Sequence, residues 1–216
     1  MAKQVISSPV IRRLPRYYRF LGELEAEQTE RISSKELAQR MGFSASQIRQ
    51  DFNCFGGFGQ QGYGYNVSEL REIIGSILGV NERTGVILIG AGNLGKAVAT
   101  HLDFQKRGCR LIGIFDRNKE LHGTKTAGLP IQSMQELAEF CEQQHPEVAV
   151  LCIPKGAAQE LADQLIALGI RGFWNFSHFD LRINNPHIIV ENVHLGDSLM
   201  TLAYCMHSRP AGDSQE

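Results

Sequence analysis

The chain has 216 residues, of which 43% are hydrophobic and 21% are charged, and its formal net charge is −1. This length fits one large domain or two modest ones, and the hydrophobic content excludes a disordered chain. The longest apolar runs are no longer than a strand, and no apolar signal-peptide core follows the N-terminus. We therefore expect a cytoplasmic protein without a membrane segment.

The five cysteines are scattered along the chain and include no Cys-x-x-Cys pair. This spacing argues against a structural zinc site and against a redox dithiol. Scattered cysteines in a reducing compartment are usually small buried apolar residues, so we expect no bound metal.

Charge is unevenly distributed. Residues 1–84 carry 11 Lys and Arg against 9 Asp and Glu, a net charge of +2, whereas residues 85–216 carry 11 against 14, a net charge of −3. All charges in the first twenty residues are positive, on Lys3, Arg12, Arg13, Arg16 and Arg19. Such an arm is often only a solvated tail, but beside a DNA-binding motif it can contact phosphates.

Four helices are predicted in the N-terminal part of the chain. Each follows a serine that can cap it, and its apolar residues recur at helical spacing; the expected caps are Ser8, Ser33, Ser44 and Ser68. Pro9 would occupy the tolerated first helical position, and Glu36 would complete a capping box with Ser33. Residues 81–84 have the composition of a linker, so we place the first domain at residues 1–84.

The second and third of these helices have the spacing of a helix-turn-helix. Ala38 is the small residue at the helix crossing, Gly42 lies at the turn, and Ile48 anchors the next helix. This spacing lets the second helix project into the major groove of DNA. The exposed early positions of that helix, which can contact base edges and phosphates, are Ser44, Ser46, Gln47, Arg49 and Gln50. A small helical dimerisation domain is the alternative interpretation.

Residues 55–65 contain five glycines and four aromatic residues, a composition that cannot form a helix. A β-ribbon with a mobile tip suits it, placed where the wing of a winged helix would lie. A slim glycine-rich ribbon can enter a minor groove, which makes Gln61, Gly62 and Tyr63 further DNA-binding candidates.

After the linker, strand-like and helical runs alternate. The expected strands are residues 86–89, 111–115, 148–153, 172–175 and 188–190, with helices beginning near Asn93, Ser133 and Gly156 and a last helix over about 194–206. Alternation of this kind implies a parallel sheet covered by helices on both faces. We therefore predict an α/β domain of the Rossmann type over residues 85–216, with a C-terminal helix.

A glycine-rich loop follows the first of these strands and has the pattern G-x-G-x-x-G. Its residues are Gly90, Ala91, Gly92, Asn93, Leu94 and Gly95. Glycines there permit a tight turn, close approach of a pyrophosphate, and close packing of helix and strand. Asp116 ends the second strand, where its carboxylate would accept hydrogen bonds from ribose hydroxyls and would repel the 2′-phosphate of NADP. The loop therefore predicts NAD⁺ or NADH as the ligand, with a chance glycine loop as the alternative.

Two later strand ends should also reach the ligand, because nucleotides bind at the carboxyl ends of parallel strands. They lie at residues 152–156, which include Pro154, and at residues 174–178, which include Asn175. Asn175 would contact the nicotinamide or its ribose; an ordinary polar cap on a strand is the other interpretation.

The main alternative function is an NAD-dependent dehydrogenase with a helical appendage. That enzyme would need a substrate domain and an acid–base group beside the nicotinamide, yet little chain follows the Rossmann domain, and His178 is the sole plausible proton carrier. A CoA-binding domain would share the fold but explains Asp116 poorly. We therefore predict no catalytic residue, and a sensed ligand in place of a substrate.

With both modules in view, the sequence resembles the Rex family of redox-sensing transcriptional repressors over residues 11–206. The most specific matches are residues 46–52, 55–65 and 90–95. The resemblance implies a homodimer that binds palindromic operators on double-stranded DNA, with its C-terminal helix swapped onto the partner. It also implies release from DNA when the NADH/NAD⁺ ratio rises.

Some positions depart from the family pattern. Gln50 and Gln61 stand where many members carry Lys and Arg, which affects the expected operator sequence. His194 stands where Asp is common, an aspartate proposed to pair with an arginine that corresponds to Arg19, and His101 replaces a frequent Tyr. Histidine cannot supply the carboxylate of an ion pair. We therefore hypothesise that Arg19 pairs with Asp197, which lies about one helical turn after His194.

Overall fold

The computed structural model describes residues 6–56, 63–181, 183 and 185–208. The chain divides into two compact units, residues 1–82 and 83–216, and each has its own hydrophobic core. None of the helices in the described ranges is both long enough and apolar enough to cross a membrane.

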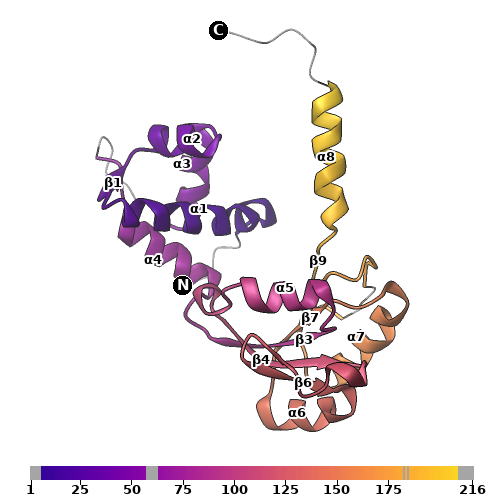
Figure 1. The fold of residues 1–216 in the computed structure, drawn as a ribbon. Helices are drawn as coiled ribbons and strands as arrows, with labels where there is room; N and C mark the ends of the chain where they lie inside the picture. The colour runs from indigo at the N-terminus through magenta and orange to yellow at the C-terminus, as the bar shows by residue number, and fades with distance from the viewer. Residues whose placement is uncertain (1–5, 57–62, 182, 184, 209–216) are drawn as a thin grey trace. The chain divides into compact units, whose positions relative to one another are not determined.

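The first unit is a small bundle of helices with a short two-stranded sheet. Its elements in chain order are α1 (Ser8–Ala26), β1 (Arg31–Ile32), α2 (Ser34–Met41), α3 (Ala45–Asn53), β2 (Tyr65–Asn66) and α4 (Val67–Leu78) (Figure 1). Helix α1 packs along α4, and α2 packs against α3. The core between them includes Leu14, Tyr17, Leu21, Ile48, Phe52, Leu70 and Ile74. This arrangement confirms the helix-turn-helix.

The structure confirms the predicted caps at α2 and α3, the two helices of the helix-turn-helix. Ser33 and Glu36 make the full capping box at the start of α2, and Gly42 ends α2 in the left-handed conformation, at φ 69°. The hydroxyl of Ser44 accepts a hydrogen bond from the Gln47 N–H at the start of α3. The local residues therefore fix both the turn and the direction in which α3 leaves it.

The caps predicted for the outer helices were wrong. Helix α1 begins at Ser8, so the N-cap position is Ser7. Helix α4 begins at Val67 and is capped by Asn66, whose side-chain oxygen accepts hydrogen bonds from the N–H of Glu69 and the hydroxyl of Ser68. Asn66 takes this place because it already has the extended conformation of a strand residue.

The base of the predicted ribbon is built differently from a local hairpin. Strand β2 pairs antiparallel with β1, with Tyr65 opposite Ile32, so one side of the ribbon comes from the segment before α2. Gly64 has φ 69°, and a Cβ there would lie 2.7 Å from the carbonyl oxygen of Ile32. The candidates Gln61 and Gly62 lie outside the described residues.

The second unit contains a seven-stranded sheet in the order β5-β6-β4-β3-β7-β8-β9. The strands are β3 (Thr84–Ile89), β4 (Cys109–Asp116), β5 (Lys125–Thr126), β6 (Leu129–Ser133), β7 (Val148–Leu151), β8 (Gly172–Asn175) and β9 (Ile189–Asn192). Every pairing is parallel except that of β5 with β6. From β6 to β9 this is the strand order of a dinucleotide-binding Rossmann domain, as predicted.

Helices cover both faces of this sheet. One face packs against α6 (Leu137–Gln144) and α7 (Ala158–Ala167), and the other packs against α5 (Asn93–His101). Strands β5 and β6 were not predicted from the sequence. They are short, β6 contains a proline, and Ile131 is its one fully buried residue, so no hydrophobic pattern marks it.

The C-terminal helix α8 (Leu195–Ser208) extends away from the sheet of its own unit (Figure 1). None of its residues is buried. Between 55% and 72% of the surface of each of its large apolar residues is exposed; these are Leu195, Leu199, Met200, Leu202, Tyr204 and Met206. Among the described residues this apolar surface of α8 is left exposed, whereas a helix normally packs its apolar face against another surface.

Candidate functional site

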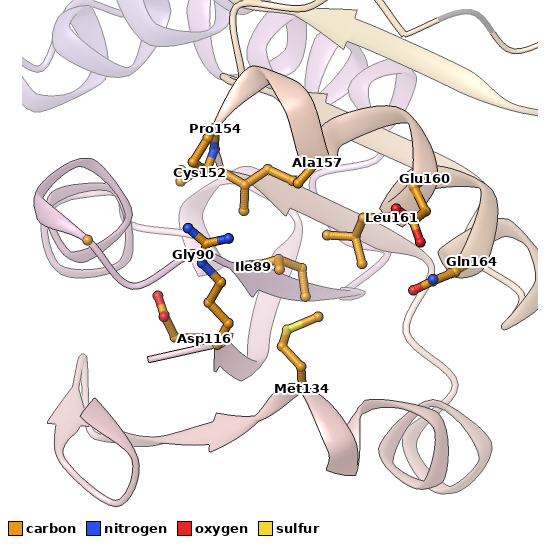
Figure 2. A pocket seen from close by; sticks show the side chains of 13 residues that line it. Ile89, Gly90, Asp116, Met134, Cys152, Pro154, Ala157, Glu160, Leu161 and Gln164 are labelled. Carbon is orange, nitrogen blue, oxygen red and sulfur yellow. The ribbon is translucent and has the colours of Figure 1, made fainter. Parts of the chain in front are cut away.

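A cavity of about 400 Å³ opens at the carboxyl ends of β3, β4 and β7, where the strand order of the sheet reverses (Figure 2). Ligands of open α/β sheets bind at this reversal point. Gly90 and Gly92 form one side of the cavity, and Asp116 lies beside them. The predicted nucleotide site is therefore a pocket within a single unit of the chain.

Steric limits explain the glycine pattern of the loop. Gly90 has φ 97°, and a Cβ there would lie 2.3 Å from the carbonyl oxygen of Cys152. At Gly95 a Cβ would lie 1.9 Å from the carbonyl oxygen of Gly90, so α5 could not approach β3 as closely. At Gly92, by contrast, a Cβ would meet nothing within 4 Å. The fold therefore accounts for Gly90 and Gly95, whereas Gly92 leaves open space in front of α5.

Asp116 closes the loop at the end of β4. Its Oδ2 accepts a hydrogen bond from the Ala91 N–H at 2.6 Å, and its Oδ1 accepts one from the Asn118 N–H at 2.7 Å. Both oxygens keep further lone pairs for hydroxyl donors. The carboxylate is thus fixed at the mouth of the glycine loop, in the position that the sequence predicts for a ribose-binding acid.

Sequence reasoning missed the opposite side of the pocket. Met134 and Leu161 point into the cavity, and Glu160 and Gln164 approach it from α7 (Figure 2). On α7, Gln164 lies four positions after Glu160 and three after Leu161, the spacing of one helical face. Their position on the helix after β7 could have identified them; Met134 carried no such signal.

The remaining predicted nucleotide-binding residues lie in different environments. Pro154 lines the pocket. Ala91 is buried behind the loop, while Asn93 and Leu94 are exposed in the first turn of α5. The N–H groups of this turn have no carbonyl partner within the helix, which is the basis of anion binding at a helix N-terminus.

Asn175 does not line the pocket and is only 1% exposed. Its amide nitrogen donates to the carbonyl oxygen of Phe179 and to Oδ1 of Asn192, and its oxygen accepts from the N–H and hydroxyl of Ser177. These bonds brace the ends of β8 and β9, in keeping with a polar cap. Contact with a cofactor stays a prediction that would require one of them to break.

The N-terminus of α3 presents the predicted DNA-binding residues. Ser46, Arg49 and Gln50 are exposed, and Gln47 is half-buried. The hydroxyls of Ser44 and Ser46 lie 3.0 Å apart, and Arg49 donates to the hydroxyl of Ser34 at 3.2 Å. Seventy per cent of the Tyr63 surface is exposed. Apart from the two candidates outside the described residues, the polar candidates therefore lie on one helix start and one ribbon.

A buried carboxylate that sequence reasoning missed holds α3 against α1. Asp51 is 1% exposed. It accepts hydrogen bonds from Nε and Nη2 of Arg13 at 2.7 and 2.8 Å, from the hydroxyl of Tyr17 at 2.8 Å, and from Nε2 of Gln47 at 2.9 Å. The signal was present: Asp51 lies on the face of α3 that carries Ile48 and Phe52, where an acid needs buried partners.

These contacts keep Asp51 ionised. Burial by itself raises the pKa of this carboxyl, but the hydrogen bonds from Arg13, Tyr17 and Gln47 lower it by more, so the pKa lies below its ordinary value. Burial and the hydrogen bond to Asp51 raise the pKa of Tyr17, which therefore remains a donor. At neutral pH Asp51 is thus a buried anion that can only accept hydrogen bonds.

The predicted switch residues divide between the two units. Arg19 is exposed on α1, His101 is exposed at the end of α5, and Asp197 is exposed in the first turn of α8. His194 lies with its Nε2 2.9 Å from Oδ1 of Asp180. The position that commonly carries an aspartate in the family therefore engages an acid of its own unit, and pairing of Arg19 with Asp197 stays a prediction.

The cysteines are all free thiols, and their burial varies more than expected. Cys141 is buried, Cys54, Cys109 and Cys152 are half-buried, and Cys205 is exposed on α8. Burial raises the pKa of Cys152 to about 11, which suppresses its thiolate at neutral pH. Within the described residues, no three His, Cys, Asp or Glu side chains gather as a possible metal site.

Comparison with known proteins matches each unit to a family model. Residues 5–53 match a model described as a putative DNA-binding protein N-terminus, and residues 81–179 match a CoA-binding domain. The second match agrees with the fold that the CoA-binding alternative and the NAD-binding prediction share. Matches over the whole chain distinguish between these two interpretations.

Two curated relatives named redox-sensing transcriptional repressor Rex cover almost the whole chain. The protein from Caldanaerobacter subterraneus is 52% identical over 94% of this chain and 90% of its own. The protein from Clostridium botulinum is 50% identical over 94% of this chain and 97% of its own. These relatives are named as repressors, and not as the dehydrogenases that the sequence analysis weighed against them.

Solved structures give the same assignment. RSP, a Rex-family repressor, was solved in complex with β-NAD⁺ and operator DNA; it is 48% identical, with a TM-score of 0.88 over 95% of this chain and 94% of its own. Its complex with β-NADH is 45% identical, with a TM-score of 0.86 over 95% and 96%. The chain therefore belongs to the Rex family of redox-sensing transcriptional repressors.

Proposed function

We propose that this protein binds NAD⁺ or NADH in the pocket beside Asp116, binds a palindromic operator through α3 and its ribbon, and leaves the operator when the NADH/NAD⁺ ratio rises. The observation that carries the proposal is that one chain has a cavity lined by the glycine loop and Asp116 in one unit and a helix-turn-helix in the other. The related RSP, solved with both nucleotides and with operator DNA, supports it. The proposed site of action is the cytoplasm, which holds the chromosome in the bacteria of the relatives.

The geometry of the pocket supports a dinucleotide as its ligand. The open space at Gly92 leaves room for a pyrophosphate against the first turn of α5, formed by Asn93, Leu94 and Gly95. Asp116 would accept hydrogen bonds from the adenosine ribose, and its negative charge disfavours the extra phosphate of NADP. Met134 and Leu161 would provide apolar contacts for the adenine. Pro154 would lie near the cofactor, and Asn175 would act through the loop that it braces.

The DNA-binding surface would be the start of α3 together with the ribbon. Ser44 and Ser46 would contact phosphates, while Gln47, Arg49 and Gln50 would reach base edges in the major groove. Tyr63, with its neighbours Gln61 and Gly62, would approach the minor groove. Two copies of α3 related by a two-fold axis would then read a palindromic site.

A homodimer would supply that second copy. The exposed apolar residues of α8 require a partner surface, and a helix swapped between two identical chains would provide one. Nicotinamide charge differs between NAD⁺ and NADH, so a dimer with two arrangements can prefer one nucleotide in each. A ligand changes DNA affinity only through such differential affinity for the two arrangements.

The experiment is a mobility-shift assay on a palindromic site from the promoter of the protein's own gene. DNA is expected to shift without nucleotide and with NAD⁺, and NADH is expected to release it. Failure to bind DNA even at low salt would overturn the repressor proposal. Binding that persists at every NADH concentration would overturn the redox-sensing half.

A further inference from the structure

The side chain of Gln47 is held in one orientation by the buried anion beside it. Its Nε2 donates to Oδ1 of Asp51 at 2.9 Å, one turn further along α3. Asp51 is itself fixed by two hydrogen bonds from Arg13 and one from Tyr17, both on α1. A contact to a rigid, buried carboxylate therefore fixes a side chain at the predicted DNA-binding end of α3.

The chemistry of Asp51 determines which end of the Gln47 amide faces inward. An ionised carboxylate can only accept, so it must face the amide NH₂ and not the amide oxygen. The NH₂ carries two hydrogens, and Asp51 engages one. Within the described residues, Oε1 of Gln47 is neither hydrogen-bonded nor buried without a partner. The oxygen therefore remains available as acceptor and the second hydrogen as donor.

This pair of groups complements adenine and not guanine. In the major groove adenine presents the N6 amino group as donor and N7 as acceptor, whereas guanine presents two acceptors, O6 and N7. A freely rotating glutamine could direct both of its hydrogens at guanine. A glutamine with one hydrogen held by Asp51 cannot, and its oxygen would face O6.

We propose that Gln47 reads an adenine in each operator half-site and that Asp51 is the positioning residue that imposes this choice. Arg49 differs because a guanidinium has donors only, which suits phosphates or guanine. The inference rests on the proposed operator binding by α3 and specifies what one residue of that surface recognises.

The test measures binding of the full-length protein to fluorescent operator duplexes in which each base pair of the half-site is changed in turn. Wild type should show at least one A·T pair whose replacement by G·C weakens binding on the order of tenfold or more. At that position 7-deazaadenine, which lacks N7, and purine, which lacks the N6 amino group, should each weaken binding. The variant Gln47→Met should bind duplexes with adenine or guanine at that position equally well, and its preferences at the other positions should equal those of wild type.

Asp51→Asn tests the positioning role. A neutral amide can donate or accept, so Gln47 regains both orientations, and the preference for adenine over guanine should shrink at that one position. A general loss of structure would weaken binding to every duplex alike, so the ratio between duplexes separates the two effects. Gln39→Met is the matched control, because Gln39 is an exposed glutamine on α2. The base preferences of this variant should equal those of wild type.

Two results would overturn the inference: Gln47→Met keeps the wild-type preference at every position, or the preference that it loses is for guanine. Both can occur while the protein still binds its operator and responds to NADH, so they leave the proposed function standing. If wild type binds no duplex at all, the proposed function fails first and the inference falls with it. If Asp51→Asn does not fold, Gln47→Met and the base analogues still decide the question.

Discussion

Asp51 should limit the acid stability of the N-terminal unit. Its pKa is lowered in the folded state, so its stabilising contribution is complete above the unfolded value of about 3.9 and is lost as the pH falls through the lower folded value. The unfolding temperature of this unit should therefore fall steeply below about pH 4. Calorimetry across this pH range measures it.

The variant Asp51→Asn separates this group from the other carboxylates. Removing one partner of a buried ion pair should cost about 3 kcal/mol of stability at neutral pH. It should also flatten the acid dependence of the first unit, because the titrating group is gone. An acid transition as steep as that of wild type would assign the effect to other residues.

The glycines of the loop should separate folding from binding. Gly95→Ala places a Cβ 1.9 Å from a carbonyl oxygen and should cost about 3 kcal/mol of stability through overpacking. Gly92→Ala meets open space at φ −70°, so stability should change by no more than about 0.5 kcal/mol. Its added methyl would occupy the proposed pyrophosphate position, so NADH affinity should fall about tenfold or more.

Thermal unfolding and calorimetric titration with NADH check both variants. If Gly92→Ala binds NADH with wild-type affinity, the pyrophosphate does not bind at the start of α5. An unchanged unfolding temperature for Gly95→Ala would mean that α5 can shift from β3 without loss.

At the scale of elements, α8 should hold the dimer together. Leu195, Leu199, Leu202 and Met206 recur at helical spacing and are all exposed. Leu199→Glu would place a charge in the middle of this stripe, so dimer affinity should fall by several kcal/mol, because an unpaired buried charge is costly. Thr201→Glu is the matched control, since it adds the same charge on the opposite side of the helix.

Light scattering coupled to size exclusion gives the mass of each variant. A monomer is expected for Leu199→Glu at concentrations where wild type and Thr201→Glu are dimers. Equal masses for all three proteins would show that α8 does not form the dimer interface.

The elements that sequence reasoning predicted are those whose signals are local. The capping box of Ser33 with Glu36, the left-handed Gly42 and the strand–glycine loop–helix unit ending at Asp116 all depend on residues close together in the chain. The pattern of the five main parallel strands was found for the same reason. Local rules of capping and periodicity suffice there.

The elements that it missed depend on partners distant in the chain. Strand β1 has two residues and exists because it pairs with β2, over thirty positions later. The role of Asp51 depends on Arg13, which is 38 positions away. The sequence pattern places Asp51 on the buried face of α3 but does not identify a partner so distant in the chain. Sequence reasoning therefore found α3 but not the contact that orients Gln47.

At the scale of the whole molecule, two units with separate cores must be coupled for a nucleotide in one to change DNA binding by the other. Such coupling is typically about 1–3 kcal/mol, a change of roughly 5- to 150-fold in affinity. It is also reciprocal. If NADH weakens operator binding by a given factor, saturating operator DNA must lower the NADH affinities of the two pockets of the proposed dimer by the same factor in total, which is its square root for each of two equivalent pockets.

The proposed pairing of Arg19 with Asp197 offers a way to remove this coupling. His194 is engaged with Asp180 in its own unit, which leaves Asp197 as the nearby acid exposed at the start of α8. Asp197→Ala should therefore retain operator binding with NAD⁺ but lose most of the NADH-driven release, and operator DNA should no longer weaken NADH binding. Fluorescence titrations in both directions measure the two factors.

Asp180→Ala is the comparison variant. It removes the acid that contacts His194, just before α8, and leaves both Arg19 and Asp197 in place. It should keep both factors near their wild-type values. If Asp197→Ala releases DNA as wild type does, Arg19 has another partner. If the two factors disagree within one variant, a further binding site takes part or a titration has not reached equilibrium, because linkage between the sites admits a single coupling energy.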